Sequence, residues 1–293
     1  MTPAPGDVHE PPDLPVVPDV RLVAVDLDGS LLDDDKNVDP SFWRLLDALH
    51  ARGIALCPAS GRQYATLRRQ FGRDDLVYIA ENGAYVVHEG RELSSDGVDA
   101  AAALAVVDAV RDLTASGADV GTVYCGKASA YVERADRPFL DQVEPYYARL
   151  RVVDDLRAVA DDEALKLAVY DFDSSERGAG RALAALALPV QVVVSGEHWV
   201  DVMSLTADKG HALAAVQRAL GVDREQTMAF GDFLNDLGLL DAAAWSFAMD
   251  NAHPQVRAHA RFVAPSNNRN GVVRTIVAAL GLPGVLDDDP DPR

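Results

Sequence analysis

The stretch RLVAVDLDGSLL, residues 21–32, decides the fold. Its four consecutive apolar residues, Leu22 to Val25, are typical of a short strand that is buried on both faces of a parallel sheet. The strand ends in two carboxylates, Asp26 and Asp28, with one leucine between them. Two like charges at that separation disfavour each other's ionised form unless a positive charge lies between them. The stretch therefore predicts a bound cation, an unusual proton on one acid, or an exposed loop without function.

Alternating strand and helix signals continue on the C-terminal side of this stretch. Asp39 and Pro40 are typical of a helix start, and residues 54–59 (IALCPA) predict a second strand that ends at SGR, residues 60–62. A further helix then leads to residues 76–80 (LVYIA), which predict a third strand. This is a βαβαβ order, and right-handed crossovers would place all three strands in one parallel sheet.

The pattern changes at Ala84. Two hairpins are predicted, with turns at Glu89–Gly90 and Gly126–Lys127, and helical segments lie between and after them. This mixture indicates a separate α+β unit with an antiparallel sheet. Strands resume near Val190, and the alternation of strand and helix returns from Asp208.

We therefore predict an α/β protein with a Rossmann-like core built on a parallel sheet and an inserted α+β cap domain. The boundaries that we assign are residues 20–84 and 190–283 for the core and 85–189 for the cap. Segments rich in proline and acidic residues predict a disordered N-terminal arm, residues 1–19, and an acidic C-terminal tail, residues 284–293.

The composition excludes several classes of protein. The 293 residues carry a formal net charge of −19, which argues against unspecific binding to nucleic acid or to an anionic membrane. Cys57 and Cys125 lack the spacing of a disulfide framework or zinc site, and Cys57 is expected to be buried packing. No apolar run could span a bilayer, and the N-terminus is unlike a signal peptide. We expect a soluble cytoplasmic protein, a monomer or small homo-oligomer, with no nucleic-acid or membrane partner.

Polar residues follow the predicted core strands directly. In open α/β sheets, ligands bind beyond the carboxyl ends of the strands. Carboxylates at neighbouring strand ends would converge there, and Mg²⁺ suits a few carboxylates together with waters and substrate oxygens. Asp236 is open to two interpretations, support of a metal or capping of a helix. The residues at these strand ends are Asp26, Asp28, Ser60, Asp232, Asn235 and Asp236.

Such a site is suited to phosphoryl transfer. A carboxylate at a strand end can attack phosphorus and form an aspartyl-phosphate, and Asp26 is the candidate nucleophile. Asp28 could protonate the leaving oxygen and then deprotonate water, and its closeness to Asp26 favours a bound proton. The reaction also needs donors and a fixed positive charge. Ser60 with the backbone of Gly61 could supply the donors, and Lys209 the charge.

The motifs DLDGSLL (26–32), SGR (60–62), the lysine of DKG (208–210) and GDFLND (231–236) resemble, in order and spacing, the four motifs of the haloacid dehalogenase superfamily phosphatases. ENGA, AMDNA and SNNRNGV are similar to the Cof-type branch, whose members carry a C2B-type cap between the second and third motifs. The resemblance implies a Mg²⁺-dependent phosphatase. It assigns the nucleophile to Asp26, acid/base catalysis to Asp28, phosphate positioning to Ser60 and Lys209, and metal ligation to Asp26, Asp28 (by its carbonyl) and Asp232, with Asp236 as a further metal candidate.

Several residues and functions stay open at this point. Phe233 and Leu234 are larger than is common in the fourth motif and could narrow the mouth of the site. The expected substrate is a small phosphorylated metabolite, such as a sugar phosphate. Transfer of the phosphoryl group to a second acceptor, as in a mutase, is the alternative, and a receiver-like phospho-aspartate module is a more distant one. Candidate substrate-binding residues are Gly61, Arg62, Asn82, Lys209 and Asn235, with Lys166 and His198 as cap candidates.

Overall fold

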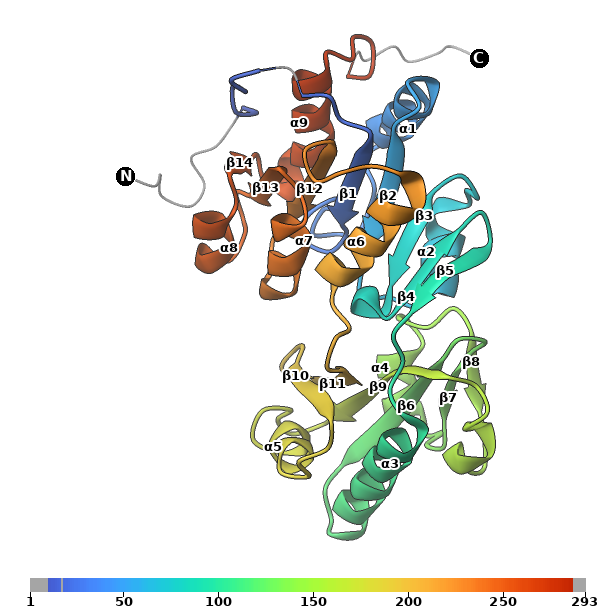
Figure 1. Ribbon diagram of the computed structural model, residues 1–293. Helices are drawn as coiled ribbons and strands as arrows, with labels where there is room; N and C mark the ends of the chain where they lie inside the picture. The colour runs from blue at the N-terminus through green and yellow to red at the C-terminus, as the bar shows by residue number, and fades with distance from the viewer. Residues whose placement is uncertain (1–9, 17, 287–293) are drawn as a thin grey trace, which may run out of the picture.

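Two β-sheets divide the chain into an upper core and a lower cap, as Figure 1 shows. The structure is a computed structural model that describes residues 10–16 and 18–286. Most of the predicted N-terminal arm and acidic C-terminal tail lies outside the described residues. The predicted fold class is confirmed, because a parallel core sheet with helices on both faces carries an inserted α+β cap.

The core sheet has eight strands, of which six run parallel. The two strands at one end, β4 and β5, form an antiparallel hairpin that extends the sheet beside β3. In sheet order the strands are β14 (Phe262–Ala264), β13 (Trp245–Met249), β12 (Thr227–Gly231), β1 (Leu22–Asp26), β2 (Ala55–Ala59), β3 (Val77–Ala80), β4 (Tyr85–His88) and β5 (Arg91–Ser95).

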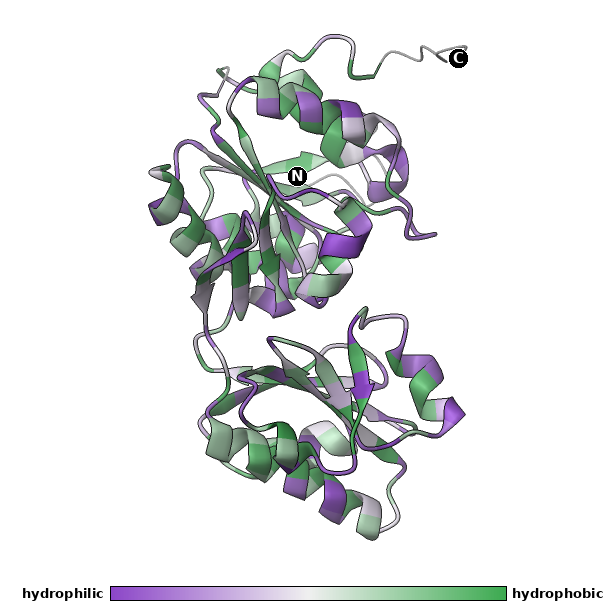
Figure 2. Cartoon of the chain, turned by 90° about the vertical axis from the view of Figure 1, so that its right-hand side faces the viewer, coloured by the Kyte–Doolittle hydropathy of each residue, from purple (hydrophilic) through white to green (hydrophobic). Residues whose placement is uncertain are grey.

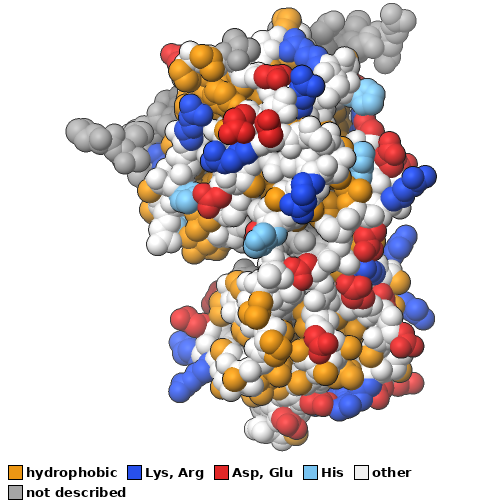
Figure 3. Space-filling view, in the orientation of Figure 1, with side chains coloured by type: hydrophobic (Ala, Val, Ile, Leu, Met, Phe, Trp, Pro, Cys, Tyr) orange, Lys and Arg blue, Asp and Glu red, His pale blue; other side chains and the backbone are white. Residues whose placement is uncertain are grey.

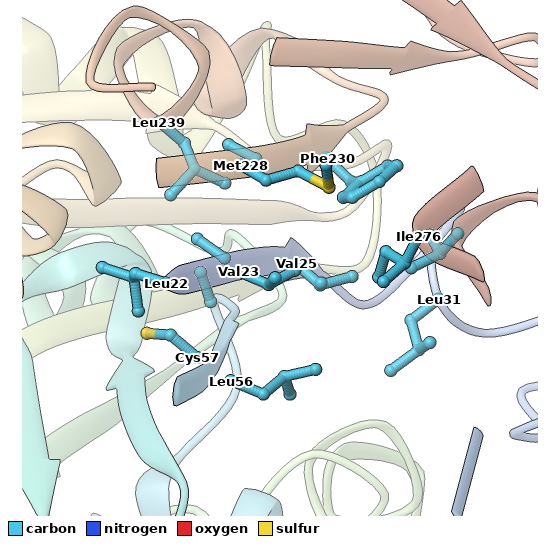
Figure 4. Close-up of a cluster of buried hydrophobic side chains, with 14 of the residues drawn as sticks. Leu22, Val23, Val25, Leu31, Leu56, Cys57, Met228, Phe230, Leu239 and Ile276 are labelled. Carbon is cyan, nitrogen blue, oxygen red and sulfur yellow. The ribbon is translucent and has the colours of Figure 1, made fainter. Parts of the chain in front are cut away.

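Helices cover both faces of this sheet. α1 and α9 contact each other on one face, and α6 contacts α7 on the other (Figure 1). Because the central strands are almost entirely apolar, they can be buried on both sides, and Figure 4 shows side chains of β1, β2 and β12 packed into one cluster. Cys57 lies fully buried in this cluster, as predicted. The core helices are α1 (Ser41–Ala51), α2 (Tyr64–Phe71), α6 (Lys209–Leu220), α7 (Leu237–Asp241), α8 (Pro254–His259) and α9 (Gly271–Leu280).

The cap sheet has six strands and is antiparallel except where β7 pairs with β8. Helices α3 (Ala100–Ala115) and α5 (Ala179–Ala184) pack on one face, and α4 (Arg137–Val143) packs on the other. In sheet order the strands are β10 (Val190–Val194), β11 (Trp199–Ser204), β9 (Ala164–Asp171), β6 (Val120–Gly126), β7 (Ala130–Val132) and β8 (Leu150–Val152).

This pairing corrects the boundaries predicted for the insertion at residues 84/85 and 189/190. The β4–β5 hairpin turns at Glu89–Gly90, as predicted, but it belongs to the core sheet. β10 and β11 belong to the cap sheet, where β11 pairs with β9. A hairpin signal in a sequence reports local pairing and does not say which sheet the hairpin joins, so the change of pattern at Ala84 was a poor guide to the boundary.

The chain crosses between the two lobes at two short segments, which Figure 2 shows as thin connections. On the outward crossing, the Asp96 amide donates to the Ala84 carbonyl of the core at 2.9 Å, and the Val98 amide donates to the Ala164 carbonyl of the cap at 2.7 Å. Gly97 alone lies between these two anchors. On the return, the Gln191 side chain of the cap donates to the Ala207 carbonyl at 2.7 Å, and α6 begins after Asp208.

The register of the parallel strands sets the position of the site. Asp26 lies opposite Ala59, and Val25 lies opposite Phe230. Because all three strands run in the same direction, Asp26, Ser60 and Asp232 come to the same edge of the sheet, facing the cap. In the described part of the chain, we find no helix with the length and apolar character that crossing a membrane requires.

Candidate active site

A cleft of about 350 Å³ lies between the carboxyl edge of the core sheet and the cap. All of the site residues predicted in the core line it except Lys209 and Asp236, which are buried and contact Asp26 or each other. The cap closes the cleft with Tyr146, Tyr147, Lys166, Trp199 and Asp201. A concave site at this edge is where an α/β sheet binds its ligands.

Lys209 connects the acids of the site. Asp208 caps α6 by accepting hydrogen bonds from the amides of Gly210 and His211, which fixes Lys209 as the first residue of the helix. The Lys209 Nζ atom lies 2.6 Å from Asp26 Oδ1 and 2.6 Å from Asp236 Oδ1. Lys209 is 1% exposed, so this charge acts at low dielectric, where it is screened little by solvent.

The loop after β12 is held in place by Asp236. Its second carboxylate oxygen accepts hydrogen bonds from the backbone amides of Asp232 at 3.0 Å and Phe233 at 3.1 Å. Gly29 lies against the same loop with a φ of +81°, and a Cβ atom there would lie 2.3 Å from Asp232 Oδ2. Only glycine combines this backbone conformation with such close approach. The loop after β1 and the loop after β12 therefore pack directly against each other at Gly29 and Asp232.

The carboxyl groups of Asp26 and Asp232 have raised pKa values, which shifts both toward their protonated forms. Burial raises the pKa of Asp26 well above its usual value, and the charge on Asp236 adds to this effect, which Lys209 only partly offsets. Burial, followed by the charge on Asp236, raises the pKa of Asp232 to about 6. Burial lowers the pKa of Lys209, but the charges of Asp236 and Asp26 outweigh it and leave the net pKa raised. One ammonium group does not compensate three carboxylates.

The donor set fits a divalent cation. One oxygen from each of Asp26, Asp232 and Asp236 lies within 4.8 Å of the others. Oxygen-only carboxylate ligands are those that Mg²⁺ prefers, and a cation would offset both the burial of these acids and their mutual repulsion, which together raise the pKa values of Asp26 and Asp232. The carboxylate of Asp28 is outside this cluster. Both oxygens of Asp236 already accept hydrogen bonds, so Asp236 orients Lys209 and the loop whether or not it touches a metal.

The structure contradicts the expectation that closeness to Asp26 favours a proton on Asp28. Burial alone would raise the pKa of Asp28, but Arg62 donates to both carboxylate oxygens, at 2.9 and 2.7 Å, and Lys36 lies 3.0 Å away. These two cations outweigh burial and lower the pKa of Asp28 below its usual value. Asp28 is therefore held ionised in this arrangement, and the Arg62 guanidinium is bound to its carboxylate.

The remaining predicted core residues gather on one side of the cleft. The Ser60 hydroxyl accepts from the Arg62 amide at 3.2 Å. Gly61 lies against the Asn82 side chain, since a Cβ atom on Gly61 would lie 3.0 Å from Asn82 Oδ1. Asn235 donates to the same Asn82 oxygen at 3.2 Å. The structure thus brings together donor groups from three separate loops.

The two cap candidates have different positions. Lys166 is 5% exposed and its Nζ donates to the Gly61 carbonyl at 2.9 Å, with Glu81 at 3.1 Å, so it lies in the cleft. His198 does not line the cleft. Its ring nitrogen Nδ1 donates to the Asp171 carbonyl at 2.8 Å, and the ring stacks on Tyr170. Phe233, which was expected to narrow the mouth, does line the cleft, whereas Leu234 does not.

Sequence reasoning missed the residues that hold the cap against the core. Gln63 exchanges two hydrogen bonds with the backbone of Arg149, at 3.0 and 2.9 Å. The Thr66 hydroxyl donates to the Tyr146 carbonyl at 2.9 Å and accepts from the Ala148 amide at 3.0 Å. Polar residues on the first turn of a helix gave no signal that distinguished them from ordinary exposed positions.

A parallel core sheet with a lysine-linked carboxylate cluster at its edge, closed by an inserted cap, has the groups that a capped enzyme of phosphoryl transfer requires. The chain belongs to the haloacid dehalogenase-like hydrolases, whose family model matches residues 23–276. It is accordingly an enzyme, a phosphatase of this superfamily.

Individual relatives agree with this assignment. The chain is 33% identical over 266 residues to the 5-amino-6-(5-phospho-D-ribitylamino)uracil phosphatase YbjI of Escherichia coli K12, covering 89% of this chain and 96% of that protein. It is 27% identical over 242 residues to the HMP-PP phosphatase of Cronobacter sakazakii, covering 81% and 87%. In fold it is similar to the HAD subclass IIB sugar phosphatase BT4131, with a TM-score of 0.73, 20% identity and coverage of 89% and 99%.

Proposed function

We propose that this enzyme hydrolyses small phosphomonoesters in a Mg²⁺-dependent reaction through an aspartyl-phosphate on Asp26. The observation that carries the proposal is the position of Asp26, at the sheet edge facing the cleft, 2.6 Å from a buried lysine and next to two further carboxylates. The relatives in E. coli and C. sakazakii are named as phosphatases of small metabolites, which supports a substrate of that class.

Asp26 must be ionised when it attacks phosphorus. Its buried position opposes ionisation, and Lys209 at 2.6 Å favours it. Asp26 and Asp232, with Asp236 and the Asp28 carbonyl as further candidates, would hold Mg²⁺. When bound, this cation supplies positive charge to the phosphoryl oxygens. Ser60 and the amides that follow it would orient the remaining oxygens from the opposite side.

Asp28 is suited to the second half of the reaction in the arrangement observed. As an ionised carboxylate held by Arg62, it can accept a proton from the water that hydrolyses the phosphoenzyme. Protonation of the leaving oxygen in the first half requires Asp28 to carry a proton. We infer that the substrate phosphate draws Arg62 away from Asp28, which removes the strongest influence that lowers the pKa of Asp28.

The proposal is tested by turnover of p-nitrophenyl phosphate with and without Mg²⁺. We expect many turnovers per enzyme with Mg²⁺ and none with a chelator, and a phosphoenzyme that rapid acid quench traps on the wild type but not on Asp26→Asn. A single phosphorylation without turnover would instead support a receiver-like module. Turnover that depends on an added acceptor alcohol would support transfer, as in a mutase.

A further inference from the structure

The inner wall of the cap is formed by alternate residues of two adjacent strands. β9 contributes Lys166 and Ala168 to the cleft, and β11 contributes Trp199 and Asp201. Asp201 pairs in register with Ala168, whose methyl group is too small to cover a neighbouring carboxylate. Because side chains on a strand alternate between faces, all four residues point toward the core.

The Asp201 carboxylate faces the cleft without a donor of its own. Asp201 is 7% exposed and lines the cleft, and within residues 10–16 and 18–286 its side chain accepts no hydrogen bond. Its nearest cation is Lys166, at 3.6 Å, which is beyond hydrogen-bond distance. The Lys166 ammonium is directed instead to the Gly61 carbonyl and to Glu81. A buried acceptor in this state needs donors from water or from a ligand.

The charge around Asp201 is unbalanced. One basic side chain, Lys166, faces two acidic side chains, Glu81 and Asp201, and all three are at most 7% exposed. This end of the cleft therefore holds one more acidic than basic side chain, and the aromatic side chains of Trp199 and Tyr146 lie beside it. An anionic group brought here would meet a like charge that solvent screens poorly.

We propose that Asp201 is a specificity-determining residue, which accepts a hydrogen bond from a hydroxyl or amino group of the leaving alcohol and rejects leaving alcohols that carry a second anion. The inference rests on the proposed phosphatase function and names its substrate class, a phosphomonoester whose alcohol is neutral or cationic and rich in donors. Rejection follows from a carboxylate that accepts no hydrogen bond from the described residues and from the excess of acidic over basic side chains, so it is lost when the Asp201 carboxylate is replaced.

The test compares matched substrates that differ only at the end remote from the phosphate. Alditol phosphates and aldonate phosphates of four to six carbons share their length, and the terminal hydroxymethyl group of the first replaces the carboxylate of the second. We expect kcat/KM of the wild type to favour the alditol phosphate by roughly tenfold or more at one of these lengths. Glucosamine 6-phosphate should likewise be preferred to glucose 6-phosphate.

Asp201→Asn removes the charge and keeps the shape, and it should reduce both preferences by about tenfold. Asp161→Asn is the matched control, because Asp161 is an exposed cap residue that does not line the cleft. Turnover of p-nitrophenyl phosphate, which carries no donor to reach Asp201, reports folding and chemistry and should be unchanged in Asp161→Asn, and thermal melts report the folding of the Asp201 variants. Asp201→Ser serves as a second charge-removing variant if Asp201→Asn fails to fold.

The outcomes separate this inference from the function on which it rests. An active wild type whose preferences persist unchanged in the folded Asp201 variants overturns the inference alone. Equal loss of preference in Asp161→Asn would also overturn it, because the effect would then follow net charge rather than position. A wild type that turns over neither p-nitrophenyl phosphate nor any alditol phosphate overturns the proposed function and this inference with it.

Discussion

Replacing Lys209 with methionine removes one charge and two hydrogen bonds of 2.6 Å from a site where the lysine and its partners, Asp26 and Asp236, are at most 6% exposed. Methionine has a similar length, so the packing changes little. Removing one partner of a buried ion pair typically costs about 3–5 kcal/mol, because the remaining charge stays buried without compensation. For a protein of this size we expect a loss of about 10 °C in Tm.

The cost should depend on pH with a defined sign. Without Lys209, the pKa values of Asp26 and Asp232 rise further above those of the unfolded chain, so the folded state binds protons more tightly. When the pKa of an acid is higher in the folded protein than in the unfolded chain, the free energy of unfolding falls as the pH rises from the unfolded-chain pKa to the folded-protein pKa. The deficit of Lys209→Met should thus be small at pH 5 and full at pH 8. Added Mg²⁺ should restore much of the stability but not kcat.

Urea unfolding followed by tryptophan fluorescence measures this effect, since Trp43 and Trp245 lie in the core and Trp199 lies in the cap. Lys127→Met is the control, because Lys127 is partly exposed and pairs with Glu92 and Glu163 near the surface. We expect that control to cost at most about 1 kcal/mol. A metal-free Lys209→Met protein as stable as wild type at pH 8 would refute the electrostatic account of the site.

Three further predictions concern the same acids. Asp26→Asn should reduce turnover in steady-state kinetics to below about a thousandth of wild type, because the nucleophile is lost. In thermal melts at pH 7.5 the metal-free variant should be at least as stable as wild type, because the raised pKa of Asp26 shows that its charge is costly there. Asp28→Asn should still form a phosphoenzyme slowly from p-nitrophenyl phosphate but hydrolyse it poorly, and rapid hydrolysis of the quench-trapped species would argue against an acid/base role. Mg²⁺ should raise Tm more at pH 7.5 than at pH 5, since Asp232, with a pKa of about 6, must lose its proton to bind a cation; an equal shift at both pH values would place the cation elsewhere.

Those features of the core that depend on local pattern could be read from the sequence. The apolar run from Leu22 to Val25 and the polar residues after it predict a buried parallel strand with a site at its end, and the register of β1 with β2 and β12 brings Asp26, Ser60 and Asp232 to one edge. Lys209 could be recognised because its place after Asp208 and before the fourth motif is a matter of order along the chain.

Features that depend on which distant residue a side chain meets could not be read in this way. Asp28 lies two residues from Asp26, yet the cation that contributes most to lowering its pKa against burial is Arg62, which is 34 residues away in sequence. The same limit applies to the cap. The docking of the cap on the core determines which face of β9 and β11 turns toward the core, and therefore whether Asp201 reaches the cleft. The sequence has no periodic signal that separates Asp201 from other polar residues of these strands.

The two crossings between the lobes have a mechanical consequence. The outward crossing is anchored to the core at Asp96 and to the cap at Val98, and the return passes from a cap-anchored Ala207 directly into α6. Two fixed crossings define an axis, so a rigid cap can rotate about that axis at low energy, while twisting or sliding would strain both crossings. We therefore expect the cap to open by a hinge rotation about the line that joins the two crossings. The hydrogen bonds of Gln63 and Thr66 to the cap backbone, and those of Lys166 to the core, have to break before the cap opens.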